Sequence, residues 1–165
     1  MRLTDIGNGS LVFIDANIFL YSIGSHPVYG EPCKEFLKRV EEKMFDGRSS
    51  VVVLNELLHK LVLGEISMKH GLTLSQSLSL IKKNPRMLSS LEAYGLVDKL
   101  EEMPNLTIHE VTPQIFNSAR SYMRKYNLMS NDAIHVATCK SHGIKHIATN
   151  DADFQRVDFL KVWKP

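Results

Sequence analysis

The chain has 165 residues, of which 44% are hydrophobic and 23% are charged, and its net charge is +2. This length and composition are typical of one globular domain, residues 1–165, and exclude an intrinsically disordered chain. No apolar stretch reaches the roughly 18 residues that a membrane helix requires, and the first residues lack a signal-peptide pattern, so we expect a cytoplasmic protein with no membrane partner. The small positive charge does not by itself indicate a nucleic-acid partner.

Two apolar runs in the first third of the chain have the character of buried strands. Leu11–Ile14 is short and continuously apolar and stops at Asp15, while Val51–Leu54 is rich in β-branched residues. Between these runs, residues 32–46 carry apolar side chains at helical spacing and predict a helix. Helical spacing returns after the second run, and residues 72–100 are expected to form two or three further helices.

The second half of the chain continues the alternation of strands and helices. Residues 106–111 alternate between apolar and polar side chains and predict a strand. Thr112, followed by a proline, indicates the start of a helix. Residues 130–143 predict another helix, opened by a serine–asparagine cap and ended by a glycine. The short apolar runs at residues 145–149 and 159–163 predict a fourth strand and a final edge strand.

Strands that alternate with helices predict an α/β fold, a three-layer α/β/α sandwich with a central, mostly parallel sheet. In such sheets the functional crevice lies outside the carboxyl ends of the strands. Asp15 directly follows the first predicted strand, Glu56 lies two residues after the second, and Asp151 follows the fourth. Asp132 lies in the first turn of the preceding helix. We therefore expect these carboxylates to meet.

Each of these acids also has an ordinary structural explanation. Asp15 could cap the turn that follows it. Glu56 and Asp132 could be first-turn acids that the helix dipole favours. Asp151 and Asp153 lie in a turn-like stretch where aspartate is common, and the spacing leaves open which of the two joins the site.

A cluster of carboxylates indicates a bound cation, because like charges at one place repel and would protonate unless a cation neutralised them. Oxygen ligands select hard ions such as Mg²⁺ or Mn²⁺. The candidate metal ligands are Asp15, Asp132, and Asp151 or Asp153. Glu56 would be a further ligand or would orient the attacking water. A site of this kind predicts catalytic hydrolysis of phosphodiester bonds.

Four stretches of the chain, taken together, resemble the PIN-domain family, especially its VapC-like toxin ribonucleases. They are Phe13–Ile18, Asn55-Glu56-Leu57, Asn131-Asp132-Ala133 and Ile147–Phe154, which occur in the family's order and span nearly the whole chain. Asp15, Glu56 and Asp132 match the family's three most dependable acids. The fourth acid falls where both Asp151 and Asp153 fit.

The resemblance implies a PIN-like fold and a Mg²⁺- or Mn²⁺-dependent endoribonuclease that acts on RNA, as the toxin of a VapBC-type toxin–antitoxin pair. It also implies an antitoxin protein as a partner, and a homodimer. Asn17 and Ser130 match polar positions that support the site. Ala16 stands where the family often has threonine or serine. The helical segment between Glu56 and Leu106 is longer than in minimal members, so no role can be carried over to it.

Two other functions stay open. The chain could be a non-catalytic PIN-like subunit that binds RNA or serves as a scaffold, for example in RNA processing, or it could be a metal-dependent phosphatase. Against a phosphatase of the haloacid dehalogenase type, Asn17 stands where that chemistry requires a second aspartate. His142 and His146 flank a helix-ending glycine, so they should not form a zinc site. His135 could lie near the acids, although we interpret it as a packed or surface histidine.

Overall fold

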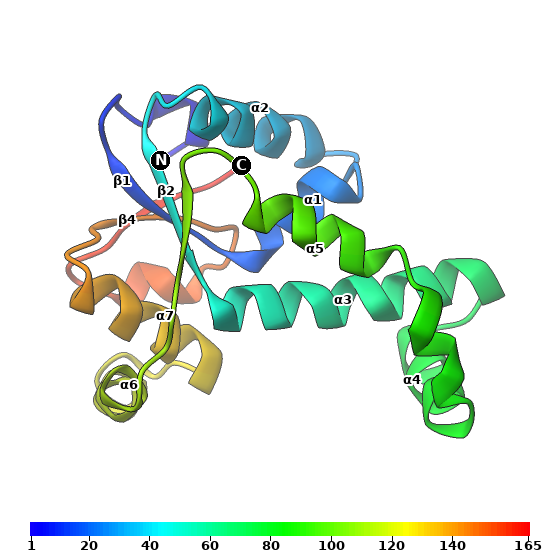
Figure 1. Cartoon of the computed structure of the whole chain (residues 1–165). Helices are drawn as coiled ribbons and strands as arrows, with labels where there is room; N and C mark the ends of the chain where they lie inside the picture. The colour runs from blue at the N-terminus through cyan, green and yellow to red at the C-terminus, as the bar shows by residue number, and fades with distance from the viewer.

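The computed structural model describes residues 1–165 and contains a sheet of five parallel strands (Figure 1). The strands are β1 (Leu11–Ile14), β2 (Asp46–Ser50), β3 (Leu106–His109), β4 (His146–Ala148) and β5 (Lys161–Trp163). Their order across the sheet is β3-β2-β1-β4-β5, and every neighbouring pair is parallel. The predicted parallel α/β sheet is confirmed, and the last strand lies at its edge as expected.

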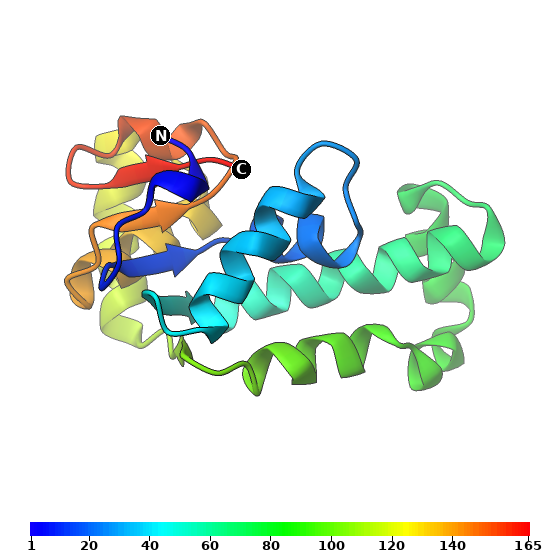
Figure 2. The same ribbon diagram turned by 90° about the horizontal axis from the view of Figure 1, so that it is seen from above.

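Helices cover both faces of this sheet. They are α1 (Ala16–Ile23), α2 (Gly30–Glu41), α3 (Val51–His70), α4 (Leu74–Lys83), α5 (Ala93–Glu101), α6 (Pro113–Tyr126) and α7 (Ser130–Ser141). Helices α1, α2, α3 and α5 lie on one side, and α6 and α7 pack together on the other (Figures 1 and 2). This follows from right-handed crossovers, because the chain steps from β1 to β3 in one direction and then returns past β1 to β4. The three-layer sandwich is confirmed.

The second predicted strand is wrong. Val51–Leu54 forms the first turn of α3, and the strand is the polar segment before it, Asp46–Ser50. Ser50 ends β2 and caps α3, since its Oγ accepts a hydrogen bond of 3.3 Å from the Val53 N–H. A short apolar run does not distinguish a strand from a helix turn, because both can carry β-branched side chains. The helix predicted at 32–46 correspondingly ends earlier, at Glu41.

The polar strand β2 is stable in the sheet because its backbone pairs with β1 and with β3. Its side chains either form hydrogen bonds or are small enough to fit under the helices. The Ser49 Oγ donates a 3.0 Å hydrogen bond to the carbonyl of Ile14 on β1. Gly47 lies where α2 approaches the sheet, and a Cβ added there would come within 2.7 Å of a methyl group of Val40. Glycine is therefore required at this position by close packing.

One cluster of 33 buried hydrophobic residues joins the sheet to the helices. That residues 1–165 form a single domain stays a prediction. Helix α3 continues well beyond the sheet and carries α4 near its far end (Figures 1 and 2). The segment predicted to form two or three helices contains α4, a short 3-10 segment (Pro85–Ser90) and α5. No helix of the chain combines the length and the apolar character needed to cross a membrane.

Candidate active site

The candidate site lies at the carboxyl ends of β1 and β4, where the topology of the sheet reverses. Strand β1 lies between β2 and β4. The chain leaves β1 into α1 on one face, whereas it enters β4 from α7 on the other. Open α/β sheets bind ligands at such a switch point, because the diverging connections leave a crevice there. Asp15 directly follows β1, and Thr149, Asn150 and Asp151 follow β4.

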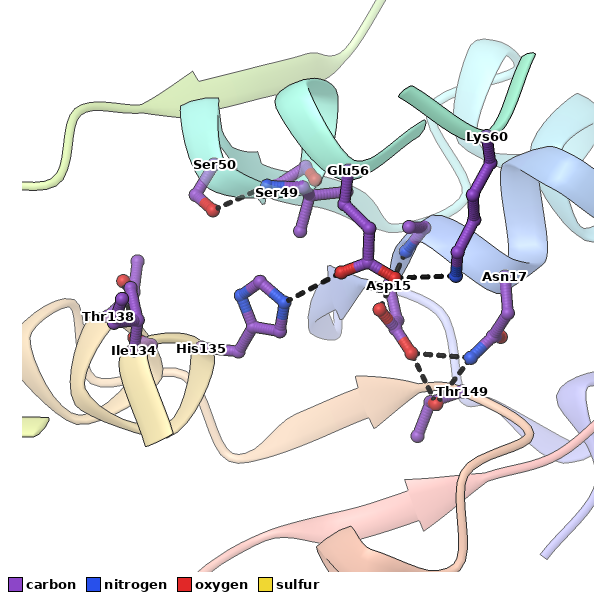
Figure 3. A network of polar contacts seen from close by, with 12 residues as sticks. Asp15, Asn17, Ser49, Ser50, Glu56, Lys60, Ile134, His135, Thr138 and Thr149 are labelled. Atoms are coloured by element: carbon purple, nitrogen blue, oxygen red, sulfur yellow. Dashed lines mark hydrogen bonds and ion pairs between the residues drawn. The ribbon is translucent and has the colours of Figure 1, made fainter. Parts of the chain in front are cut away.

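Asp15 is anchored at this crevice by hydrogen bonds from three donors (Figure 3). It is the N-cap of α1, and its Oδ1 accepts a 2.7 Å hydrogen bond from the Ala16 N–H. Its Oδ2 accepts hydrogen bonds from the Thr149 hydroxyl, at 2.6 Å, and from the Asn17 side-chain amide. Asp15 is only 5% exposed, and burial raises the pKa of its carboxyl despite these donors. The prediction that Asp15 caps the following turn and the prediction that it lies at the site are therefore compatible.

A polar network ties the ends of β1 and β4 together around this carboxylate. The Asn17 amide nitrogen also donates to the Thr149 hydroxyl, at 3.0 Å, and its oxygen accepts the Asn150 N–H at 3.1 Å. The Thr149 hydroxyl in turn accepts the Asp151 N–H at 3.0 Å. Asn17 therefore lies where a supporting residue was predicted. Thr149, which is fully buried, was not singled out from the sequence.

Glu56 reaches the site from a different element than predicted. It lies in the second turn of α3 and not just after a strand. Its Oε1 is 2.6 Å from the Lys60 ammonium, one turn further along the helix, and its Oε2 is 4.0 Å from the His135 imidazole (Figure 3). The interaction with His135, followed by the interaction with Lys60, holds the pKa of Glu56 at about 2. Glu56 is therefore ionised at neutral pH.

Asp132 lies in the first turn of α7, as predicted, although the cap differs. The N-cap is Met129, so Ser130 is the first helical residue and is exposed instead of capping the helix. Burial, together with the negative charges of Asp151, Asp15 and Asp153, raises the pKa of Asp132 to about 6, against an opposing effect of His135. The carboxylates of Asp15, Asp151 and Asp153 thus lie near enough to act on Asp132.

Asp151 and Asp153 differ in their surroundings. The Asp153 carboxylate pairs with the guanidinium of Arg156, one turn further along its 3-10 segment (Asp153–Arg156). Asp151 has no such cation, and its Oδ1 accepts the Asp153 N–H at 2.8 Å. Asp151 also raises the pKa of Asp132 more than Asp153 does. The geometry favours Asp151 as the partner of Asp132.

His135 is both packed and close to the acids. It is 1% exposed, and its ring packs near the rings of Phe13 and Phe154, with centroid distances of 5.5 and 6.4 Å. Neither ring nitrogen has a hydrogen-bond partner. Lys60 was not predicted at the site, although its spacing of four residues from Glu56 is a sequence signal for an ion pair.

The donor set fits a hard divalent cation that retains water ligands. Burial is the first cause of the raised pKa of both Asp132 and Asp15, so a bound cation would offset the cost of ionising these carboxyls. No three acidic, histidine or cysteine side chains converge closely enough to surround an ion by themselves. Mg²⁺ is commonly held by one or two carboxylates and several waters, so this open arrangement of oxygen donors suits it, and Mn²⁺ accepts the same type of ligand.

Comparisons with known proteins agree with this fold. Residues 12–160 match the family model of the PIN domain. The chain is 30% identical over 152 residues to Ribonuclease VapC2 of Methanocaldococcus jannaschii, which covers 92% of this chain and 91% of that protein. It is also 30% identical over 158 residues to Ribonuclease VapC6 of the same organism, with coverage of 94% and 97%.

Solved structures with lower identity share the fold. Mycobacterium tuberculosis VapC20, described as a sarcin–ricin loop cleaving toxin, has a TM-score of 0.62 at 15% identity, with coverage of 92% of this chain and 98% of that chain. VapBC2 from Rickettsia felis, bound to a DNA fragment from its promoter, has a TM-score of 0.58 at 16% identity, with coverage of 93% and 98%. Because the family model spans most of the sequence and two relatives reach 30% identity over nearly all of it, the chain belongs to the PIN-domain family.

Proposed function

We propose that this PIN-domain chain is a VapC-type endoribonuclease that hydrolyses RNA phosphodiester bonds with the help of Mg²⁺ or Mn²⁺. The observation that carries the proposal is the placement of Asp15 and Asp151 just after the neighbouring strands β1 and β4, with Asp132 on α7 close enough for both charges to raise its pKa. The relatives named Ribonuclease VapC support RNA as the substrate. The acids alone would suit any phosphate ester.

The proposed ligands of the cation are Asp15, Asp132 and Asp151, with Asp153 as the alternative to Asp151. Because these side chains do not converge closely, some of them would bind the cation through water. When bound, a divalent cation lowers the pKa of a coordinated water and offsets negative charge on the scissile phosphate. Asn17 and Thr149 fix the Asp15 carboxylate through their hydrogen bonds, so this side chain does not have to reorganise during the reaction. Their role resembles that of the outer hydrogen-bonding shell found around metal ligands in general.

Glu56 is proposed to orient the attacking water. Its low pKa keeps it ionised and able to accept a hydrogen bond from that water at neutral pH. Lys60 lies beside it and, being an exposed cation, can approach a phosphate oxygen of the substrate. The chain thus supplies a negative group for the water and a positive group for the phosphate from one helical turn of α3.

The biological setting proposed for the chain is that of a toxin held in check by an antitoxin protein. Neighbours in structure include VapBC toxin–antitoxin complexes, which motivates this partner. A homodimer and a cytoplasmic location, where cellular RNA is available, belong to the same proposal and need separate measurement by light scattering and fractionation.

Cleavage of mixed RNAs by the purified chain in Mg²⁺, Mn²⁺ or a chelator tests the function. We expect cleavage with either cation, none with the chelator, and a loss of about 100-fold or more in Asp15→Asn, because the site loses a charge at its centre. Asp98→Asn, an exposed position on α5, is the control and should cleave normally. Wild-type cleavage by Asp15→Asn in the same metal would contradict the assignment. Turnover of phosphate monoesters without RNA cleavage would indicate a phosphatase. A chain with neither activity would be a binding subunit.

A further inference from the structure

Both ring nitrogens of His135 are buried without a hydrogen-bond partner. Buried polar atoms are almost always paired, because leaving them unpaired costs free energy that an apolar side chain would not lose. The ring is fully enclosed and packs near the aromatic rings of Phe13 and Phe154, so a phenylalanine could occupy this place. The presence of an imidazole here therefore calls for a reason other than packing.

The nearest charged acceptor for His135 is Glu56. The His135 Nε2 and the Glu56 Oε2 are 4.0 Å apart, about 1 Å more than a normal hydrogen bond (Figure 3). The other oxygen of Glu56 is held by Lys60. Glu56 thus lies between two donors on opposite sides, and a small rotation of its side chain brings Oε2 within reach of the imidazole. Catalytic hydrogen bonds are often this long until substrate is bound.

The two donors differ in how well they can fix a carboxylate. The Lys60 side chain is 42% exposed and flexible, so it can turn toward solvent or toward substrate. His135 is enclosed, and it lies on α7 three residues after Asp132, on the same side of the helix. A hydrogen bond from His135 would therefore tie Glu56 on α3 to the helix that carries Asp132.

We propose that His135 is a positioning residue for Glu56: its Nε2–H donates to Oε2 and holds this carboxylate beside Asp15 and Asp132 when the site is loaded. This rests on the proposed function, in which Glu56 orients the attacking water. His135 itself touches neither substrate nor water in this scheme. Its contribution is to select one orientation of a side chain that Lys60 alone would leave mobile.

Two substitutions separate positioning from packing. His135→Phe keeps a ring of similar size beside the two phenylalanines, so the thermal midpoint should stay the same or rise, while kcat falls about 10- to 100-fold at unchanged KM. His135→Gln places an amide N–H near the position of Nε2 and should recover most of kcat. His142→Phe, at the C-terminal end of the same helix, is the control and should leave kcat unchanged.

Coupling between the two residues gives a further criterion. If His135 acts through Glu56, adding His135→Phe to Glu56→Gln should cause no further loss of kcat, because residues that act as a unit are not additive. Full additivity would overturn the proposal. So would wild-type kcat in His135→Phe, or equal loss of kcat in the Phe and Gln variants.

A measurement that needs no catalysis tests the hydrogen bond directly. In NMR spectra, adding Mg²⁺ to the full chain should move the His135 Nε2 proton downfield, and Glu56→Leu should abolish this change. The same change in Glu56→Leu, or none in the wild type, would refute the bond. If the chain cleaves no RNA yet shows the bond, the proposed function fails while the contact stands. Normal cleavage by His135→Phe would reject the positioning role and leave the function intact.

Discussion

Replacing Asp132 with asparagine is expected to stabilise the metal-free chain at neutral pH. The pKa of this carboxyl is raised from 3.8 to about 6, first by burial and then by the charges of Asp151, Asp15 and Asp153. The difference corresponds to about 3 kcal/mol of unfavourable interaction when Asp132 is ionised. Since the side chain is only partly buried, solvent screening reduces the expected gain from Asp132→Asn to about 1–2 kcal/mol.

The stability gained by Asp132→Asn should depend on pH, because the Asp132 carboxyl titrates at different pH values in the folded and unfolded chain. The folded chain holds the Asp132 proton up to about pH 6, whereas the unfolded chain releases it near pH 4, so ionisation opposes folding only above about pH 4. The gain should therefore be complete above about pH 7 and absent below about pH 4. Urea unfolding in a chelator at both pH values measures it, with Asp98→Asn as the control. A loss of stability at pH 7, or an equal gain at both pH values, would refute the reasoning.

Three further substitutions test the supports of the site and the sheet. Thr149→Val removes the donor to Asp15 and should cost about 1–3 kcal/mol of stability and about 10- to 100-fold in cleavage. Thr138→Val, an equally buried threonine whose hydroxyl bonds only a helix carbonyl, should leave cleavage unchanged. Gly47→Ala should lower the free energy of unfolding in urea by about 1–3 kcal/mol, because the new methyl group clashes with Val40. The cleavage pattern should stay intact. An unchanged free energy of unfolding would show that α2 can move away from β2.

The alternation of apolar runs and helical segments was sufficient to predict the architecture. Helices cover both sides of β1, so all four residues of Leu11–Ile14 are apolar. The continuous apolar run allowed this strand to be predicted from the sequence. Asp46–Ser50 was missed because it contains no large apolar residue. Its identity as a strand depends on pairing with β1 and β3 and on close packing at Gly47, which are non-local.

In the candidate site, the residues that directly follow strands could be predicted from the sequence, and the others could not. Asp15 and Asp151 follow β1 and β4, so the convergence of parallel strands brings them together. Glu56 was expected for a wrong reason, since its side chain comes from the second turn of α3. Thr149 and His135 could not be assigned from spacing, because a buried hydroxyl and a buried imidazole look the same in sequence whether they support a site or fill a core.

Substitution of an acid and substitution of a residue that hydrogen-bonds an acid should change stability in opposite directions. This difference distinguishes a functional cluster from a structural one. Asp132 carries a charge that opposes folding, so its removal should raise stability while it lowers activity. Thr149 satisfies a buried carboxylate oxygen, so its loss should lower both. A purely structural cluster would lose stability in either case. Under the proposed function, binding of the cation would offset the charge of Asp132 that opposes folding.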